Sequence, residues 1–348
     1  MRGKAGILLL LAIAVPAVGC APRATPPPET VDVPAGWFEM GRPYDSDGHS
    51  DEAPVHNVYL DNYAIGKYPV TNREFAGVLN WALAKGRLQD DVGNAYNGGK
   101  VFAYGKPLAD TLASAHGSQI SFGAGQFEVL SRTGYNGEEF SMDEHPVVLV
   151  TWYGAVAYCN WLSEMHRLRP CYDTETWDRL RPVPNGYRLP TEAEWERAAA
   201  WDGQRHQRYG VGSDTLDFTQ ANFFESDYAN PLRLTSMPYT SPVGWYNGGN
   251  LAQLTVSSVW TQNAVSPVGC YDMAGNVWEW CHDWYDAEYY ARSGLANPTG
   301  PETGAHRVGR GGSWRYASDH CRAADRYWNW AEYHSRYQGF RVAIFLNR

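Results

Sequence analysis

The segment that ends this chain limits its fold more than any other stretch of the sequence. Residues 315–338 contain no Val, Ile, Leu, Met or Phe, but they contain four Tyr, two Trp, four Arg and two His. A buried strand or helix repeats aliphatic side chains, whereas binding surfaces are rich in aromatic residues and Arg. Residues 310–314 (RGGSW) precede the segment and 339–341 (GFR) follow it. The pattern predicts a recognition surface held between two structural clamps.

The N-terminus predicts a bacterial lipoprotein signal peptide at residues 1–20. Arg2 and Lys4 precede an apolar run at 7–18, which is shorter than the roughly 20 residues that a membrane-spanning helix needs. The small residues before Cys20 resemble the lipobox at which such proteins are cleaved and acylated. We therefore expect lipidation of Cys20, with an ordinary signal peptide as the alternative.

A Pro-rich tether is expected at residues 21–31, between the lipid anchor and the folded part. Because Ala21 rather than Asp follows the cysteine, we expect the anchor in the outer membrane or at the cell surface. The periplasmic side is the alternative location within the cell envelope.

Residues 32–348 predict one large, loop-rich α+β domain. The chain has 15 Trp, 23 Tyr and 35 Gly, which favours short strands, many turns and aromatic packing. Its net charge of −9 and the absence of a basic run argue against nucleic-acid binding. We expect a monomer.

Three amphipathic helices are expected, each beginning after a threonine: Thr71, Thr151 and Thr191. The first and third have capping-box spacing, with Glu74 and Glu194 three residues after the threonine, so these glutamates have a structural role. Extended segments are expected at 36–40, 55–60 and 147–150. The stretches 85–142 and 202–262 lack clear periodicity and predict long surface loops.

Seven motifs occur along the chain in a fixed order: GWFEMG (36–41), PVH (54–56), YPVTN (68–72), YRLPTEAEWE (187–196), DMAGNVWEW (272–280), GGSW (311–314) and GFR (339–341). Together they resemble the formylglycine-generating-enzyme family, also called the FGE-sulfatase or sulfatase-modifying-factor family. The resemblance covers roughly residues 32–345. It implies a variant C-type-lectin-like fold with little regular secondary structure.

The family includes a copper oxidase whose two cysteines follow a Gly-Gly-Ser motif and bind Cu(I) as soft thiolates. The resemblance places those two positions at Tyr316 and Cys321. A phenol does not replace the first thiolate, so we expect no copper, no oxidase activity and no catalytic residue. A periplasmic oxidase of this family remains the alternative.

The resemblance also implies a disulfide between Cys281 and Cys321, which would join the C-terminal segment to the core. Cys159 and Cys171 could pair as well and leave Cys270 free.

A structural calcium ion is implied by the resemblance around the DMAGNVWEW motif. Its ligands would be Asp272, the carbonyls of Gly275 and Val277, and Glu279, because carboxylate and carbonyl oxygens suit a hard cation. The alternative is that these residues only shape a turn.

The C-terminal segment further resembles the variable proteins of diversity-generating retroelements, several of which are surface lipoproteins. That resemblance implies ligand display rather than catalysis, with an unknown protein or glycan as the ligand. A structural cell-envelope lipoprotein is the alternative. Arg322 and Arg326 are expected to lie inside, paired with carboxylates or carbonyls. The expected ligand-binding residues are Tyr316, His320, Tyr327, Trp328, Trp330, Tyr333, Arg336 and Tyr337.

Overall fold

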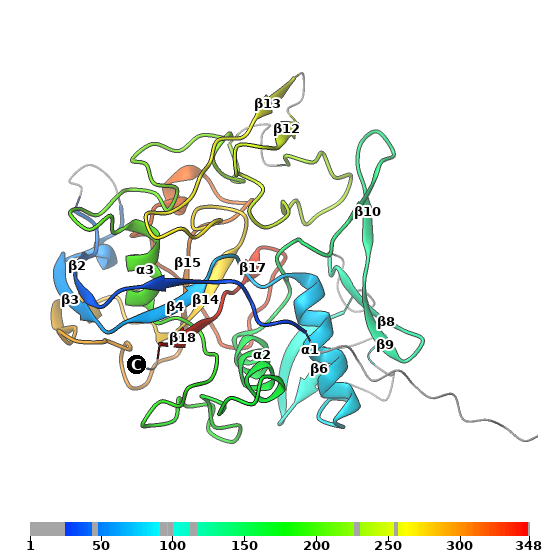
Figure 1. Ribbon diagram of the computed structural model, residues 1–348, viewed down its shortest axis with the longest axis horizontal. Helices are drawn as coiled ribbons and strands as arrows, with labels where there is room; N and C mark the ends of the chain where they lie inside the picture. The colour runs from blue at the N-terminus through cyan, green and yellow to red at the C-terminus, as the bar shows by residue number, and fades with distance from the viewer. Residues whose placement is uncertain are drawn as a thin grey trace, which may run out of the picture.

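The computed structural model describes residues 25–43, 48–90, 96, 100–111, 117–225, 230–253 and 257–346. Within these ranges the chain forms three α-helices and many short strands, joined by long irregular segments (Figure 1). The predicted loop-rich α+β architecture is confirmed. In the part of the chain described, none of the helices has the length and apolar character needed to cross a membrane.

The predicted signal peptide and Cys20 lie outside the described residues. The predicted tether overlaps the first strand, since its last two residues, Thr30 and Val31, belong to β1 (Thr30–Val33).

All three helices begin at the predicted threonines. They are α1 (Asn72–Ala84), α2 (Trp152–Met165) and α3 (Glu192–Ala200). The Thr191 hydroxyl accepts the Glu194 backbone N–H at 3.2 Å, and the Glu194 carboxylate accepts the Thr191 N–H at 2.8 Å. Thr71 and Glu74 form the same capping box. Such caps each stabilise a helix by about 1 kcal/mol, so these local signals are sufficient to set where the helices begin.

A four-stranded sheet carries the C-terminal segment. Its strands are β14 (Trp278–Trp284), β15 (Arg307–Arg310), β16 (Tyr327–Asn329) and β17 (Gln338–Gly339), in the order β16-β15-β14-β17. The antiparallel register of β15 and β16 places Val308 opposite Trp328. The segment therefore starts beside β15, forms the edge strand β16 and returns to the opposite edge as β17.

Two further sheets pack around this one. The first contains β1, β4 (Tyr63–Gly66) and β18 (Ala343–Phe345), and the second pairs β2 (Gly36–Met40) with β3 (His56–Leu60). The predicted strands at 36–40 and 55–60 are thus confirmed within one residue. The predicted extended segment at 147–150 forms one isolated bridge, Val150 with Ala109, and the preceding Pro146 forms another with Thr71.

The prediction of a long loop over 85–142 is wrong, because this stretch contains short strands that mostly pair as hairpins. They are β5 (Gln89–Asp90), β6 (Lys100–Ala103), β7 (Lys106–Asp110), β8 (Ile120–Gly123), β9 (Gln126–Val129), β10 (Ser131–Thr133) and β11 (Glu139–Ser141). Two of the turns are Tyr104-Gly105 and Ala124-Gly125, in which both residues have positive φ. An X-Gly pair with this backbone forms the tight turn of a two-residue hairpin. The stretch 202–262 is mostly irregular, as predicted, with one hairpin of β12 (Leu251–Gln253) and β13 (Ser258–Trp260).

The core consists of two large apolar clusters on either side of β14. Successive side chains of a strand point to opposite faces, and accordingly Trp280 packs in the cluster with α1 and α2, whereas Cys281 packs in the cluster with α3. Figure 1 shows α1 and α2 on one side of the central strands and α3 with β2 and β3 on the other. The central sheet is therefore buried on both faces, and its β16 edge is where the chain presents unburied side chains.

Candidate functional site

The predicted clamps are buried and tie the two ends of the C-terminal segment together. Trp314, at the start, is 3% exposed, and its indole N–H donates to the carbonyl of Arg336 at 3.0 Å. Phe340 and Arg341, at the end, are fully buried. The segment 315–338 is thus a closed excursion whose ends are fixed.

Gly312 is required where the segment begins. Its φ of +75° lies in the left-handed region, and a Cβ there would be 2.5 Å from Sγ of Cys321 and 2.8 Å from the carbonyl oxygen of His320. Both contacts are closer than real Cβ atoms approach, so only glycine fits. This close approach seats the short helix η3 (Ser318–Cys321) against the sheet.

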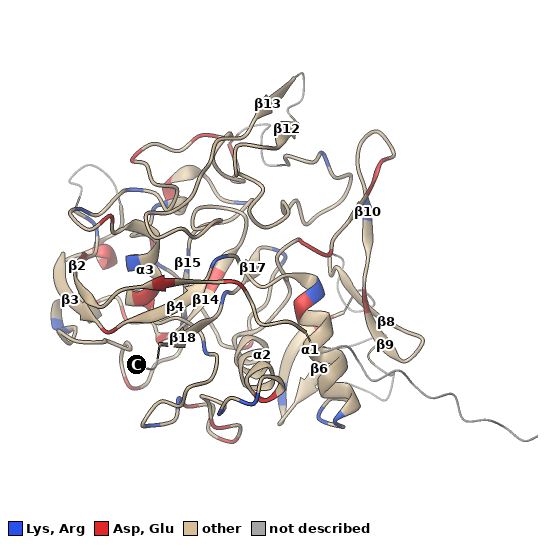
Figure 2. Ribbon diagram, viewed as in Figure 1, with Lys and Arg blue, Asp and Glu red and all other residues tan. Residues whose placement is uncertain are grey.

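The structure confirms the interior position of the two arginines. Arg322 donates to both carboxylate oxygens of Glu52, at 2.5 and 2.8 Å, and Arg326 donates to both oxygens of Glu192, at 2.7 and 3.0 Å. Both acids are nearly inaccessible to solvent. Glu192 lies on α3, which carries acidic and basic residues inside the fold (Figure 2). A buried charge is tolerated when it is paired in this bidentate way.

Trp328 and Trp330 are the exposed aromatic residues of the segment. Trp328 is 43% exposed and Trp330 is 62% exposed. Tyr285 stacks on Trp328 at 5.5 Å between ring centroids, and the His306 ring lies 4.4 Å from Trp328 and 5.1 Å from Trp330. We name these four residues the tryptophan face. Sequence reasoning missed Tyr285 and His306, since they lie in other parts of the chain.

The predicted tyrosines gather on the opposite side of β16. Tyr327 stacks on the buried Trp278 at 4.8 Å, and Tyr316 packs edge-on against Trp278 at 5.7 Å. Tyr316 also contacts Tyr337 at 5.5 Å, and the hydroxyls of Tyr333 and Tyr337 are hydrogen-bonded at 2.7 Å. We name the four tyrosines and Trp278 the tyrosine group.

Burial is the main cause that raises the pKa of Tyr316, Tyr327 and Tyr333 above the usual range of a phenol. These hydroxyls therefore stay protonated near neutral pH and remain able to donate hydrogen bonds.

The eight predicted ligand-binding residues thus fall into separate places. The remaining two, His320 and Arg336, lie at the margins of the tyrosine group: the His320 ring is 5.2 Å from that of Tyr316, and Arg336 reaches the sulfur of Met237 at 3.9 Å. The stem of Arg336 lies over Gly117, where an added Cβ would come within 2.8 Å of it. No single flat surface unites all eight.

The copper positions of the family do not fit a thiolate pair in this chain. Tyr316 is packed among aromatic rings, and Cys321 is fully buried, with its Sγ 3.7 Å from the carbonyl of Ala317. Burial raises the pKa of the Cys321 thiol, which disfavours the thiolate that a soft metal requires.

The predicted disulfide between Cys281 and Cys321 is absent and is corrected here. Cys159, Cys171, Cys270, Cys281 and Cys321 are all buried free thiols, so the alternative pairing of Cys159 with Cys171 is absent too. Cys281 packs in the cluster with α3, whereas Cys321 packs with Tyr209 and Phe223 in another cluster. The two side chains have separate apolar surroundings, and the segment is held by Arg pairs and by Trp314 instead.

The four predicted calcium ligands lie on the turn before β14 and at its start. Asp272, in left-handed backbone (φ 57°), accepts the Gly244 N–H at 2.6 Å. Burial raises the pKa of Asp272 to about 6, so its carboxylate would gain from a cation. Glu279 has other partners: Arg341 donates to both of its oxygens, at 2.6 and 2.7 Å, and the indole of Trp195 donates at 2.8 Å. Glu279 is therefore engaged elsewhere, and of the predicted ligands Asp272 and the carbonyls of Gly275 and Val277 remain.

This protein has a loop-rich α+β fold with two large apolar clusters and a C-terminal segment whose two ends are fixed. Residues 16–346 match the sequence model of the sulfatase-modifying factor enzyme 1-like domain. The chain belongs to this FGE-sulfatase family.

Two relatives and one solved structure illustrate the membership. The chain is 32% identical to the formylglycine-generating enzyme of Streptomyces coelicolor, over 95% of this chain and 93% of that one. It is 33% identical to the serine/threonine-protein kinase Pkn1 of Chlamydia trachomatis, over 90% of this chain but only 38% of the kinase's length. It shares the fold of Treponema denticola variable protein 1 with a TM-score of 0.57, 23% identity, and coverage of 91% of this chain and 95% of the other.

Proposed function

We propose that this protein is a lipid-anchored, extracytoplasmic ligand-binding member of the FGE-sulfatase family that uses segment 315–338 to bind a protein or a glycan. Anchoring at Cys20 in the cell envelope, at the outer membrane or cell surface, and a monomeric state belong to the same proposal. The observation that carries it is the pair of exposed tryptophans in a segment whose two ends are fixed: Trp328 on the edge strand β16 and Trp330 directly after it.

The physical argument rests on the tryptophan face. Exposed aromatic side chains that are already held by neighbours lose little conformational entropy on binding. The contacts of Tyr285 and His306 restrain both indole rings before any ligand arrives. Tryptophans in such positions are typical binding hot spots, worth about 2 kcal/mol or more each.

The donor set supports binding rather than copper oxidation. Where the family's oxidase has two thiols, this chain has the phenol of Tyr316 and the enclosed thiol of Cys321. The residues that remain near these positions are aromatic hydroxyls, which bind by stacking and hydrogen bonding.

The test is a comparison of exposed tryptophans on the same protein. Purified full chain, Trp328→Ala and Trp330→Ala are applied to an array of glycans and of surface proteins, with Trp260→Ala as the control because Trp260 is 64% exposed and lies on β13. We expect each tail variant to bind its array partner about 30-fold more weakly, in line with a hot spot of 2 kcal/mol. If all three variants bind as the unaltered chain does, the binding surface lies elsewhere.

Diversification by a retroelement belongs to this proposal as a further possibility. Resequencing codons 310–345 across many isolates tests it. Substitutions confined to adenine-containing template codons, beside a near-copy and a reverse-transcriptase gene, are the expected result. An invariant segment would leave the binding function and remove the diversification.

A second candidate function is the oxidase, favoured by the 32% identity to a formylglycine-generating enzyme across 93% of its length. Its test is Cu(I) binding and oxidation of a cysteine-containing peptide, in parallel with Cys321→Ser.

The third candidate function is that of a structural envelope protein. It predicts loss of envelope assembly when the gene is deleted, and no specific defect when only 315–338 is removed.

We also propose a structural calcium ion held by Asp272 and the carbonyls of Gly275 and Val277. Bound calcium would neutralise a buried carboxylate and fix the turn before β14. Chelation should then lower the melting temperature of the full chain, and Asp272→Asn should abolish that response.

A further inference from the structure

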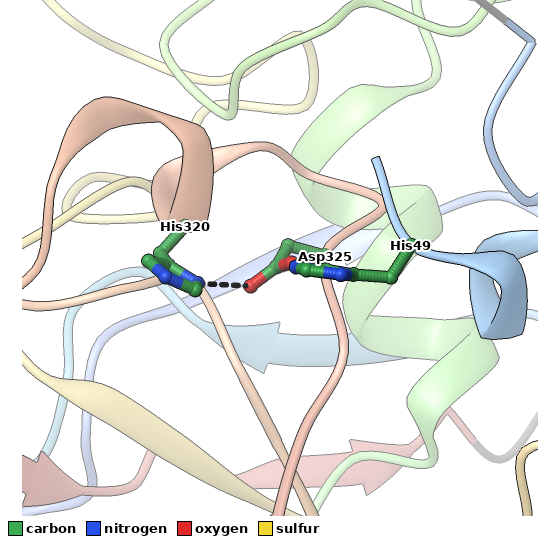
Figure 3. Close-up of side chains that lie close together, drawn as sticks. All are labelled: His49, His320 and Asp325. Carbon is green, nitrogen blue, oxygen red and sulfur yellow. Dashed lines mark hydrogen bonds and ion pairs between the residues drawn. The ribbon is translucent and has the colours of Figure 1, made fainter. Parts of the chain in front are cut away.

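Three potential metal ligands from distant parts of the sequence meet beside η3. His49 directly precedes the short helix η1 (Ser50–Glu52), His320 lies in η3, and Asp325 follows η3. Nε2 of His49 is 3.7 Å from Oδ1 of Asp325, and Nδ1 of His320 is 3.4 Å from Oδ2 of the same carboxylate. The three ligand atoms all lie within 4.8 Å of one another, and Figure 3 shows the carboxylate between the two rings.

The spacing is close to that of a preformed metal site. Ligands about 2.0–2.1 Å from a tetrahedral zinc ion are about 3.4 Å apart. His320 lies 3.4 Å from one oxygen of the Asp325 carboxylate, and His49 lies 3.7 Å from the other oxygen. The rings of His49 and His320 are nearly parallel, at 23°, with centroids 6.1 Å apart. Small side-chain rotations would bring all three donors to one ion.

A buried network holds both arms of this cluster. Glu52 is fully buried, and its Oε1 accepts the backbone N–H of His49 at 2.8 Å and a guanidinium N–H of Arg322 at 2.8 Å. Arg322 in turn donates to Oδ1 of Asp325 at 3.3 Å, and Arg310 donates to the Asp325 carbonyl. Outer partners of this kind orient metal ligands.

The charges around the cluster permit a cation. Asp325 is itself buried, and Glu52 offsets the positive charge of Arg322. The second cation near Glu52 is Arg42, 3.6 Å away, while Asp319 beside His320 adds a negative charge. The arginines therefore do not leave the site with an excess of positive charge.

We propose that His49, His320 and Asp325 bind a divalent first-row transition metal ion, with Zn²⁺ as the best fit. Two imidazoles and one carboxylate are borderline donors that suit zinc, iron, cobalt or nickel better than calcium or Cu(I). Three protein ligands leave at least one coordination position for water or for an oxygen or nitrogen donor of a bound molecule.

This inference goes beyond the proposed ligand binding and does not depend on it. An ion in this position would join the part of the chain around His49 to the C-terminal segment, and it would lie next to Tyr316 through the His320 ring. Because it binds only the folded chain, it would also raise the stability of the protein in proportion to its free concentration.

The test uses Co²⁺ as a spectroscopic probe on the purified full chain without a histidine tag. We expect one equivalent to bind with visible absorption bands, and Zn²⁺ to displace it. His49→Ala and His320→Ala should each weaken binding by at least the roughly 10–100-fold that loss of an outer partner costs. His49 is 61% exposed, so its replacement should leave the fold intact.

A matched control is available in the same segment. His334 pairs with Asp110 at 2.9 Å, but this pair belongs to no group of three potential ligands among the described residues. His334→Ala should therefore bind Co²⁺ as the unaltered chain does. The proposal is overturned if the unaltered chain gives no cobalt spectrum at micromolar metal and no rise in melting temperature with Zn²⁺. Equal binding by His49→Ala, His320→Ala and the unaltered chain would overturn it as well.

Discussion

The C-terminal segment as a whole is rich in Arg and aromatic residues, but two neighbouring parts of it have opposite environments. Residues 321–326, which we call the inner part, are all buried. Residues 327–337, the outer part, are all at least partly exposed except Ala331. The inner part contains two arginines that pair with acids from other regions, whereas the outer part contains the two tryptophans of the tryptophan face and three tyrosines of the tyrosine group.

The difference shows that richness in Arg and aromatic residues does not by itself define a binding surface. Arg322 and Arg326 are buried because each forms a bidentate ion pair with a buried glutamate, Glu52 and Glu192 respectively. Trp328 lies on the edge strand β16, and Trp330 directly follows it. Both remain exposed because, among the described ring contacts, only Tyr285 and His306 pack against their indoles. Partners supplied by distant sequence decide which residue stabilises and which one binds.

The largest expected loss of stability is that caused by Arg322→Met in the inner part. This change leaves the Glu52 carboxylate buried without its main partner, which typically costs about 3–5 kcal/mol. Urea unfolding followed by circular dichroism measures the loss. Trp330→Ala in the outer part should change the same free energy by only about 0.5 kcal/mol, since Trp330 is mostly exposed.

The control for this prediction removes both charges. Glu52→Leu with Arg322→Met removes both members of the buried pair, so the double variant should be more stable than Arg322→Met alone. If Arg322→Met costs no more than Trp330→Ala, the division of the segment into a stabilising part and a binding part is wrong.

The second largest effect is expected for Gly312→Ala, which presses on the inner part through Cys321. A left-handed alanine costs about 1–2 kcal/mol, and the clash with Sγ adds about 1–3 kcal/mol of overpacking. Gly137→Ala is the matched control, because Gly137 also has positive φ (78°) but has nothing within 4 Å of the added Cβ. The melting temperature of Gly312→Ala should be well below that of Gly137→Ala. Equal melting temperatures would mean that the contact with Cys321 relaxes freely.

Local signals in the sequence were sufficient for the helices and for the clamps. The threonine caps define where each helix begins with atoms at most three residues away, so no knowledge of the fold is needed. The interior placement of Arg322 and Arg326 was also predicted, but the sequence did not indicate which acids would pair with them. The hairpins within 85–142 were missed since each strand has two to five residues, too few to show a period of two. The positive-φ turns at Gly105 and Gly125 were the available signal.

Only the part of the candidate site that segment 315–338 contributes could be predicted from the sequence. Residues 315–338 supply the aromatic rings, but Tyr285, His306 and His49 reach them from elsewhere through the topology of the sheet. The disulfide between Cys281 and Cys321 was expected from the family resemblance alone. The two thiols pack in different apolar clusters, which the sequence around them does not show.

A smaller effect is expected for Tyr333→Phe in the outer part. The change removes the hydrogen bond between the Tyr333 and Tyr337 hydroxyls, which is worth about 0.5–1.5 kcal/mol. A double-mutant cycle with Tyr337→Phe, measured by urea unfolding, isolates the pair. A coupling energy near zero would show that the two phenols are held by packing alone, and that the tyrosine group resembles the tryptophan face more than the inner part.

The smallest effect is a pH dependence of the outer part through His334. Its hydrogen bond to Asp110 raises the pKa of His334 above the ordinary value, against a smaller opposing effect of burial and of Lys100. The protonated ring is therefore favoured in the folded state, so its contribution is fully present below the unfolded pKa of about 6.5 and is lost as the pH rises through the higher folded pKa. The stability gap between the unaltered chain and His334→Gln should be larger at about pH 5.5 than at about pH 8.5, and below about 1 kcal/mol throughout. Melting temperatures at the two pH values measure the gap. The same comparison is then made between Asp110→Asn and Asp110→Asn with His334→Gln. This stability gap should not depend on pH, because neither chain can form the ion pair. A gap that is constant with pH would mean that His334 contributes to stability by packing rather than through its charge.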